Sequence, residues 1–525
     1  SYTLGFQLGP RLNAAGRLED ASLGVKLLLT ESQSEADTLA SRLDVANAER
    51  KRIESALLEQ ALSQTQTHDF THEPALIVWG EGWHAGVIGL VAGRLCQRFA
   101  CPAAVLSEEN GLLHGSLRSV PGINIHQCLQ ACDDLLLRYG GHEQAAGVTL
   151  RKENLPAFCQ RLQDAVRSRA TDELLLPAQE YDMELDFSQA DEALTQALSR
   201  MEPFGFGNPS PLFLCRNVRI ERRRVCGADG AHLQLTLRQN MRVLDGIAFG
   251  KGPEANELCD VSDVVLAVGM NTFRGQKSVK CDVKAFRPAK GGRAAGLQSA
   301  GRSAFENALL DDLLQAGKQP RRAENSMDSL ARAVGEPVNS FPLQGVRGTL
   351  LIARTPEMAL KALARYGDKL ELCKGAPTDP RCFHTLLLFP NTLRISGFWR
   401  RVVLLDGEAF EGEAQLLAHQ LTQARVDCPP SPSRSLCALM KGMDAGDAAY
   451  RELYRLLRKS VFSAPEALCE AAGLTAAQTR TGLWAFAQLG LISYTESPFS
   501  YVVLPASSCA LGDSPLLTQL RRITR

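Results

Sequence analysis

The sequence predicts a multidomain protein that combines α/β domains with a small β-barrel and a winged-helix-like tail. Strand-like and helical runs alternate between Ala75 and Tyr139, as in an α/β layer. Five short β-like runs follow between Leu214 and Phe286, enough to close a small barrel. Two capped helix starts then precede a hairpin between Ser463 and Leu504, which is winged-helix order. At about 150 residues per domain, a chain of 525 residues holds three or four domains.

The composition excludes several classes of protein. Hydrophobic residues make up 45% and charged residues 22% of the chain, which is typical of globular domains. No apolar run approaches the roughly 18 residues of a membrane span. Lys plus Arg and Asp plus Glu both number 58, so the net charge of the whole chain predicts no partner.

The 15 cysteines are scattered along the chain. Three residues separate Cys128 from Cys132, whereas a zinc knuckle or redox motif has two. Because Ser1 to Gly16 shows no signal-peptide pattern, we expect reduced, mostly buried thiols in a cytoplasmic protein. The first methionine is Met183, and Ser1 to Leu8 leads directly into a dense Gly/Pro/Asn motif. We therefore expect an upstream segment to be missing from this sequence.

The first 150 residues predict one long helix followed by an α/β domain. Ser34 to Gln64 lacks Gly and Pro and repeats apolar residues with a helical period. Beyond it, strand-like runs are expected at Ala75–Trp79, Ala103–Leu106 and Leu112–Leu117, and helices at Ala85–Phe99 and Ile123–Tyr139. Functional loops of such domains lie at strand ends.

The barrel prediction depends on five short runs and on their local charge. From Arg216 to Arg293 there are 15 Lys/Arg and 8 Asp/Glu, a surplus that indicates nucleic-acid binding. The expected strands are Leu214–Arg223, His232–Leu237, Arg242–Phe249, Asp263–Gly269 and Val279–Phe286.

The remaining chain predicts a linker, a small α/β layer domain and a second linker. Gly291–Ser303 is rich in Gly, Ala and Ser, and Gly317–Asn325 continues in a polar manner. The second linker is Cys428–Ser433. Between the linkers, strands are expected at Thr349–Ala353, His384–Phe389 and Val402–Leu405, and helices at Glu357–Tyr366 and Glu413–Arg425.

The tail contains two capping boxes, Ser463–Glu466 and Thr475–Gln478, each with a hydroxyl at a helix start and Glu or Gln three residues later. A hairpin of Leu491–Thr495 and Ser500–Leu504 follows. The second helix offers only Arg480 for contact with DNA. A role in binding protein rather than DNA therefore stays open.

Two glycine-rich motifs in the first half of the α/β region carry basic side chains. Gly9–Arg17 places Arg11 and Arg17 on an expected tight turn, from which guanidinium groups can bind phosphate bidentately. Trp79–Val87 joins a strand to a helix, so the N–H groups of the helix start and His84 would face one strand end. His84 is either a helix cap or a ligand.

Two further motifs complete the set. Gly115–Ser119 offers two hydroxyls and one guanidinium at the end of a short strand. Gly140–Gly147 places His142 after two glycines, whose backbone can approach a ligand closely. Because ordinary cores seldom place Arg or His in every glycine-rich strand end, the four motifs together predict a shared phosphate-binding surface.

These motifs resemble those of the RecJ-type single-stranded-DNA-specific exonucleases of the DHH phosphoesterase superfamily. Gly9–Leu18 resembles the segment after the catalytic domain, Leu43–Arg50 the long connecting helix, and Ala75–Gly147 the DHH-associated domain. Glu202–Phe213 and Asn271–Gly275 are similar to parts of the oligonucleotide-binding (OB) barrel. The resemblance covers about residues 1–290 and, more weakly, the tail.

The sequence pattern and the resemblance together predict a division into six parts, of which the small α/β domain depends on the layer pattern alone. They are a motif segment with a connecting helix (1–70), a DHH-associated α/β domain (71–175), an OB-fold barrel (176–290), a linker (291–345), a small α/β domain (346–427) and a winged-helix-like domain (436–525).

The resemblance also implies 5′ to 3′ hydrolysis of single-stranded DNA in recombination and repair, with Mn²⁺ or Mg²⁺. The sequence contains no Asp-His-His triplet and no Asp-Xaa-Asp followed by Gly near its start, which are the family's metal motifs. Since hydrolysis of a phosphodiester needs metal-activated hydroxide, we expect this chain alone to be inactive. Single-stranded DNA is the implied partner, and a single-stranded-DNA-binding protein or a helicase is a further candidate.

By the same pattern, His142 is the catalytic candidate, facing the scissile phosphate with Gly140 and Gly141. The implied phosphate and 5′-end set is Arg11, Asn13, Arg17, His84, Ser116, Arg118, Ser119, Gly140 and Gly141. On the barrel, Phe249 and Phe273 are either base-stacking or core residues, and Arg274, Lys277 and Lys280 are candidate strand contacts.

Three interpretations remain. The motif order favours the carboxy-terminal part of a RecJ-type exonuclease. A non-catalytic accessory protein that binds single-stranded DNA is the second. The third is a sister DHH phosphoesterase acting on short oligonucleotides or cyclic dinucleotides, although such substrates need no basic barrel.

Overall fold

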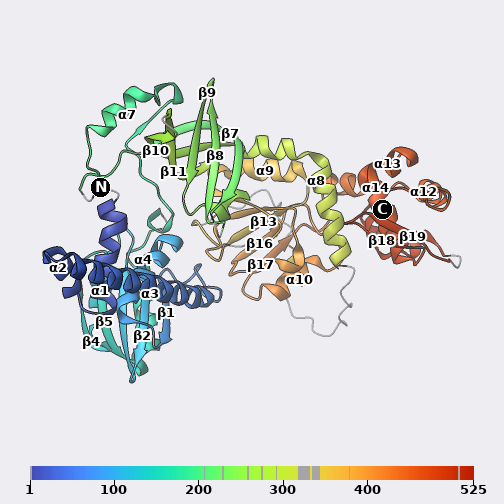
Figure 1. Ribbon diagram of the computed structural model, residues 1–525. Coiled ribbons are helices and arrows are strands. Elements are labelled where there is room, and N and C mark those ends of the chain that lie inside the picture. The colour runs from blue at the N-terminus through green and yellow to red at the C-terminus, as the bar shows by residue number, and fades with distance from the viewer. Residues whose placement is uncertain are drawn as a thin grey trace. The chain divides into compact units, whose positions relative to one another are not determined.

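The computed structural model divides into two compact units, Ser1–Arg287 and Pro288–Arg525 (Figure 1). It describes residues 3–171, 173–205, 207–227, 230–256, 259–273, 276–290, 292–316, 331–333, 343, 345–377, 379–505 and 509–524.

Unit 1 begins with three helices, α1 (Gly9–Leu18), α2 (Ser22–Leu29) and α3 (Gln33–Thr65). The predicted long helix is confirmed, and Ser32 caps it by accepting a hydrogen bond from the Glu35 N–H. The tight turn expected at Gly9–Arg17 is wrong. Pro10, which is tolerated in a first helical turn, lies at the start of α1.

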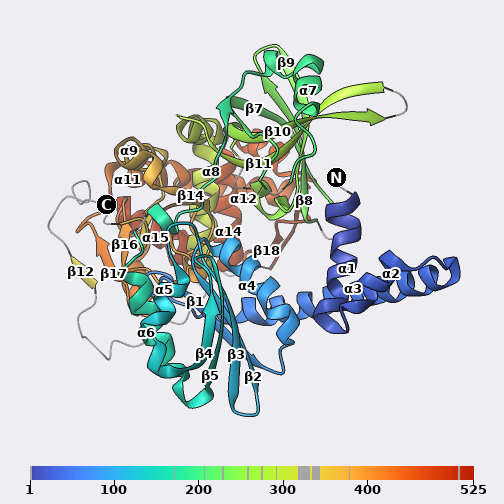
Figure 2. The same cartoon turned by 90° about the vertical axis from the view of Figure 1, so that its left-hand side faces the viewer.

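A five-stranded sheet follows, in the order β1-β2-β3-β5-β4. Only β1 and β2 are parallel. Helix α4 (Ala85–Phe99) and helix α6 (Leu155–Arg167) lie on opposite sides of the sheet (Figure 2). The strands are β1 (Leu76–Glu81), β2 (Ala103–Glu109), β3 (Leu112–Arg118), β4 (Leu136–Gly141) and β5 (Ala145–Arg151).

The helix expected over Ile123–Tyr139 is wrong in its second half. Helix α5 spans only Ile125–Gln130, capped by Asn124, and the chain then becomes strand β4. Pairing with β5 fixes this conformation, which local periodicity does not report.

The predicted barrel is confirmed. Strands β7, β8, β9, β11 and β10 form a closed ring, because β10 also pairs with β7, and β9 and β11 are parallel. Helix α7 (Glu192–Ser199) precedes the barrel and β6 (Met183–Glu184) extends it beside β7. The barrel strands are β7 (Phe213–Cys226), β8 (His232–Gln239), β9 (Arg242–Ala248), β10 (Val261–Phe273) and β11 (Gln276–Pro288).

Unit 2 contains a six-stranded sheet in the order β12-β17-β16-β13-β15-β14, whose strands pair in parallel. The predicted α/β layer is confirmed, and β14 and β17 were not predicted. The elements are β12 (Ala331–Ala333), β13 (Thr349–Ala353), α9 (Pro356–Tyr366), β14 (Glu371–Lys374), β15 (Thr385–Leu388), β16 (Arg401–Leu404), α10 (Glu413–Gln420) and β17 (Arg425–Cys428).

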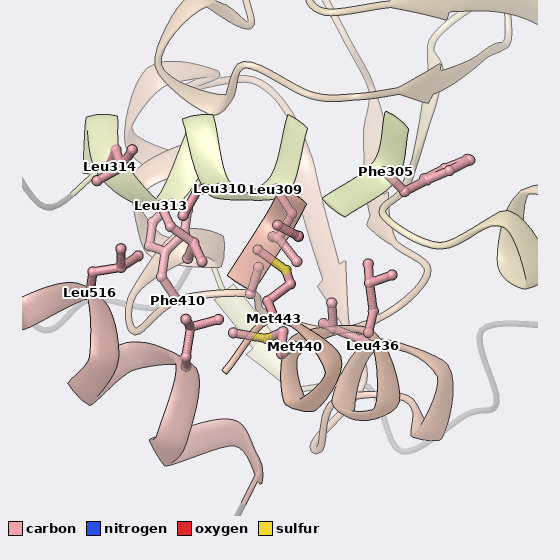
Figure 3. Packing of buried hydrophobic residues seen from close by; sticks show 14 of the residues in the cluster. Phe305, Leu309, Leu310, Leu313, Leu314, Phe410, Leu436, Met440, Met443 and Leu516 are labelled. Atoms are coloured by element: carbon pink, nitrogen blue, oxygen red, sulfur yellow. The ribbon is translucent and has the colours of Figure 1, made fainter. Parts of the chain in front are cut away.

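The linker expected over 291–345 is wrong for residues 292–316, which form helix α8 (Gly292–Ala316) with a break at Gly301. Five of its residues, Phe305, Leu309, Leu310, Leu313 and Leu314, are buried and pack with Phe410, Leu436 and Leu516 (Figure 3). Most of the other residues of the expected linker lie outside the described part of the chain. One hydrophobic core therefore joins α8, the sheet and the tail.

The tail has the predicted helix, turn, helix and hairpin. The capping box at Thr475 and Gln478 is confirmed. The one at Ser463 is wrong, because α13 begins at Pro465 with Ala464 as its N-cap. The elements are α11 (Arg434–Met443), α12 (Asp447–Lys459), α13 (Pro465–Ala472), α14 (Ala476–Gln488), β18 (Ile492–Thr495), β19 (Ser500–Val503) and α15 (Pro515–Thr524).

All 15 cysteines are free, and only Cys509 is exposed. Among the residues that the structure describes, no helix is long and apolar enough to cross a membrane.

Candidate phosphate-binding site

Strands β3, β5 and β4 leave one sheet face exposed beside α4. In the register, Ser116 lies opposite Gly147, and Gly147 lies opposite Gly140. Gly140 and Gly147 are both exposed. We call the surface around this row the open face.

The glycines at the centre of the open face are not required by packing. A Cβ atom on Gly140 would meet nothing within 4 Å, and one on Gly147 would lie 3.8 Å from the Gly115 carbonyl oxygen. Neither glycine has a positive φ. Since a glycine inside a strand weakens it unless a ligand or backbone comes close, these two residues indicate a surface for close approach.

Gly141 differs from these neighbours. Its φ is 151°, and a Cβ atom there would lie 2.3 Å from the Ala145 carbonyl oxygen. The fold itself therefore requires glycine at this position.

Ser116 and Arg118 occupy one edge of the open face. The Arg118 guanidinium donates to Ser116 Oγ at 3.1 Å and to the Leu117 carbonyl at 2.8 Å. A Cβ atom on Gly89 of α4 would lie 3.1 Å from Ser116 Oγ and 3.3 Å from Arg118 Nη2. The glycine thus brings α4 against both groups.

Arg17 joins α1 to the start of α4, where His84 also lies. Arg17 Nη1 donates to the Gly86 carbonyl at 3.0 Å, and His84 Nδ1 accepts from the Gly86 N–H at 3.1 Å. A side chain at Gly86 would collide with the Arg17 carbonyl oxygen, 2.1 Å from the Cβ position. His84 is therefore a helix cap, and the Gly86 N–H at the helix start, which we expected to be open, is occupied.

Three other predicted residues lie apart from this cluster or serve the fold. The Arg11 side chain forms an ion pair with Asp44 of α3 and donates to the Gln7 carbonyl at 2.7 Å. Asn13 is exposed on α1. Ser119 is buried, and its hydroxyl donates to the Ile123 carbonyl at 2.7 Å.

His142 follows the Gly140-Gly141 pair and is exposed. Its backbone N–H donates to the Ala145 carbonyl at 2.8 Å, and Ala145 lies opposite Arg118 in the register. The backbone thus sets His142 at the same end of the open face as Arg118.

The site offers hydrogen-bond donors for a phosphate group, but the described residues form no metal centre. Among the described residues, no group of three or more His, Cys, Asp or Glu side chains is arranged to hold a metal ion. The residues present therefore do not fit a Mn²⁺ or Mg²⁺ site.

The barrel carries a second set of candidate contacts. Phe249 follows β9 and is 57% exposed, so it is not a core residue. Its ring lies edge-on to His232, with centroids 5.3 Å apart, and His232 Nδ1 accepts from the Gly250 N–H at 3.2 Å. The two rings form a platform on which a base can stack.

Several cations on the barrel have no ion-pair partner among the residues described. Lys280 is exposed on β11, in one cross-strand row with Asp245, Thr236 and Arg222. Of the other predicted contacts, Arg274 and the side chains of Phe273 and Lys277 lie outside the described part of the chain. Among the described residues of the barrel strands, the exposed cations without an ion pair are Arg219, Arg222, Arg224, Arg242 and Lys280, of which Arg224 donates to Gln234 at 2.7 Å.

Much of the second helix of the tail, α14, is buried against the rest of unit 2. Arg480 forms ion pairs with Asp311 of α8 and Glu496 of the hairpin, and its side chain is only 17% exposed. Thr479, Thr481 and most of the apolar residues of α14 are buried. Arg480 is therefore engaged within the protein, and its contact with DNA stays a prediction.

Comparison with known families places these two surfaces in named domains. Residues 72–168 match the DHHA1 domain family, and residues 181–285 match the RecJ OB domain family. The sequence motifs indicated the same two domains in the same order, a DHH-associated domain followed by an OB-fold barrel.

The particular relatives are RecJ proteins. The chain is 38% identical over 286 residues to the single-stranded-DNA-specific exonuclease RecJ of Bacillus subtilis, covering 54% of this chain and 36% of that protein. It is 34% identical over 287 residues to RecJ of Escherichia coli, covering 53% of this chain and 50% of that protein. The predicted resemblance is thereby confirmed, and the chain spans between a third and about half of these relatives' length.

Among solved structures, RecJ of Thermus thermophilus in complex with Mn²⁺ aligns with 99% of this chain and 61% of its own, at 21% identity and a TM-score of 0.47. The same protein has also been solved with Mg²⁺.

Proposed function

We propose that this chain supplies the 5′-end, phosphate and strand-binding surfaces of a RecJ-like single-stranded-DNA exonuclease that acts 5′ to 3′ in recombination and repair. The single observation that carries the proposal is the Gly140–Gly147 pair, exposed beside Ser116 and Arg118 with no packing reason for glycine. A sugar–phosphate backbone can lie directly against these two glycines, whereas residues with side chains would hold it away.

The polar groups around Gly140 and Gly147 suit a terminal phosphate. Arg118 can donate from both ends of its guanidinium, and Ser116 can add a hydroxyl at the same place. His142, held at the same end of the sheet, is the group we propose to face the phosphate that is cleaved. Positioning of this kind supplies a large part of the rate when the nucleophile is generated elsewhere.

The barrel would carry the rest of the strand. Phe249 with His232 offers a stacking surface, and the exposed cations Arg222 and Lys280 offer backbone contacts. A chain that acts only on dinucleotides has no use for this second surface, which supports the exonuclease over the sister phosphoesterases.

The described residues of this chain supply no metal centre for the chemistry. The RecJ relatives have been solved with Mn²⁺ and Mg²⁺, and the residues described here form no such site. We therefore propose that the chain alone binds DNA and does not cleave it.

The test measures binding and cleavage in the same samples, using labelled single-stranded oligonucleotides with 5′-phosphate or 5′-hydroxyl ends and Mn²⁺. We expect binding, a preference for the 5′-phosphate and no cleavage. Cleavage by the pure chain would overturn the proposed inactivity, and absence of binding would overturn the proposed function.

Gly147→Ala sharpens this test. Its new methyl group meets no atom closer than 3.8 Å, so we expect stability to rise by about 0.5 kcal/mol, since glycine disfavours strands. Binding of 5′-phosphorylated oligonucleotides should fall several-fold because the methyl group would hold the sugar–phosphate backbone away from the strand. Unchanged binding would show that no strand lies there.

A further inference from the structure

A second basic row crosses the open face, next to the row of Ser116, Gly147 and Gly140. Its members are His114 on β3, Thr149 on β5 and Arg138 on β4, which are register neighbours. Since side chains on one face of a strand are two residues apart, the rows are separated by about 6.8 Å. No glycine-rich motif marks this row in the sequence.

A β-bulge puts Arg138 on the open face. Leu136 pairs with Leu150, which is buried on the opposite face, but Arg138 pairs with Thr149 because the register shifts between Leu136 and Arg138. Leu137 is the extra residue. If the register continued from the Leu136–Leu150 pair without the bulge, Leu137 would lie opposite Thr149, and Arg138 and Gly140 would both turn toward the core face. Bulges commonly re-aim side chains at functional sites, and this one places Arg138 and Gly140 together.

Arg138 is available to a ligand. It is exposed, and within the described part of the chain no hydrogen bond or ion pair is recorded for its guanidinium. In the same row, Thr149 Oγ1 lies 3.3 Å from His114 Nδ1, so a hydroxyl and an imidazole stand beside the guanidinium.

We propose that Arg138, with His114 and Thr149, forms a second phosphate subsite on the open face. It binds an internal phosphodiester of the same strand whose 5′-phosphate lies at Ser116 and Arg118. This inference rests on the proposed function. The two rows differ in their roles: the Arg118 row recognises the strand end, and the Arg138 row recognises the backbone that follows it.

The experiment compares Arg138→Gln, Arg138→Lys and Arg98→Gln in the full chain. Arg98 is a matched control, since it is an exposed arginine in the last turn of α4 and belongs to neither row of the open face. The probes are thymidine 5′-monophosphate and 5′-phosphorylated or 5′-hydroxyl oligothymidylates, titrated at several salt concentrations.

We expect Arg138→Gln to weaken oligonucleotide binding about five- to tenfold and to reduce the salt slope by about 0.7, the value for one single-strand phosphate contact. Binding of the mononucleotide and the ratio of 5′-phosphate to 5′-hydroxyl affinity should not change. Arg138→Lys should restore part of the affinity, and Arg98→Gln should behave as the unmodified chain.

Three outcomes would overturn the inference. They are unchanged oligonucleotide binding by Arg138→Gln, an equal loss in Arg98→Gln, and a loss of the 5′-phosphate preference, which would assign Arg138 to the end site. If the unmodified chain binds no oligonucleotide, the proposed function itself fails, which is a different result.

Discussion

The open face of unit 1 and the carboxyl end of the unit 2 sheet treat their charged side chains in opposite ways. On the open face, Arg118 and Arg138 stand beside glycines with no carboxylate paired to them in the described structure. At the end of β13, by contrast, the Arg354 side chain donates to Asp312 at 2.6 Å and to Glu413 at 2.5 Å. All three of these side chains are at most 1% exposed.

A third carboxylate, Asp406, completes the network in unit 2. Asp406 accepts hydrogen bonds from the N–H groups of Arg354 and Thr355 and from the hydroxyls of Thr355 and Ser433. Burial raises the pKa of both Asp406 and Glu413. Ligands of parallel α/β sheets usually bind outside the carboxyl ends of the strands, but here the protein's own acids occupy that place.

The two sheets therefore differ in whether buried carboxylates pair with their arginines. Both units place arginines at strand ends. In unit 2 the arginine stabilises the fold, and in unit 1 the arginines remain available for phosphate.

The largest expected effect comes from opening the unit 2 network. Arg354→Met leaves Asp312 and Glu413 buried without their cation, so the free energy of unfolding should fall by about 3–5 kcal/mol. Chemical denaturation followed by circular dichroism would measure the loss.

Binding of single-stranded DNA by the folded Arg354→Met variant should match that of the unmodified chain. A specific loss of binding in the folded variant would mean that the two regions are not separate in function.

The next largest effect is a difference in stability between substitutions of the adjacent Gly141 and Gly140. Gly141→Ala forces a side chain against the Ala145 carbonyl at positive φ, and should cost about 1–3 kcal/mol of stability. Gly140→Ala, whose methyl group meets open space, should cost none. Thermal unfolding of the two variants would check this, and equal losses would contradict the assignment of Gly140 to ligand approach.

Arg118→Ala tests the end site. Loss of a hydrogen bond to a charged group costs about 1.5 kcal/mol or more, so 5′-phosphorylated oligonucleotides should bind roughly tenfold more weakly, with little change for 5′-hydroxyl ends. Fluorescence anisotropy with both oligonucleotides measures the ratio. Equal losses would remove Arg118 from the end site.

The smallest expected effect concerns the barrel. Arg222→Gln with Lys280→Gln removes two unpaired cations, and should reduce the salt slope of binding by about 1.4, at about 0.7 for each phosphate contact. Arg238→Gln is the control, because Arg238 is already paired with Glu221. A slope that changes equally in the control would show that net charge alone sets it.

Local patterns in the sequence were sufficient for the long helix α3 and the barrel. Helix α3 and strand β8 each carry a repeat of buried side chains along their own residues, so periodicity reports them. Strand β4 was missed because the apolar run Leu135–Leu137 continues the helical period of α5. Its conformation depends on β5, which is a tertiary partner. Helix α8 was missed because its Gly/Ala/Ser-rich start has the composition of a linker.

The site could be predicted in part for the same reason. Ser116, Arg118 and Gly140 stand in glycine-rich motifs that are unusual in a core. Arg138 could not be predicted, since only the bulge at Leu137 decides which face it occupies. The ion pair of Arg11 with Asp44 and the hydrogen bond that His84 accepts from the Gly86 N–H could not be predicted either, because only the folded structure shows them.

The position of α8 also decides where the chain can be divided for biochemical work. A fragment that ends at Arg287 keeps the open face and the barrel together. A cut after Ala316, within the stretch that reads as a linker, would instead carry Phe305 and Leu309 away from the core that they fill. Both fragments would then expose the apolar surfaces that pack together in the intact unit. We expect them to aggregate rather than fold independently.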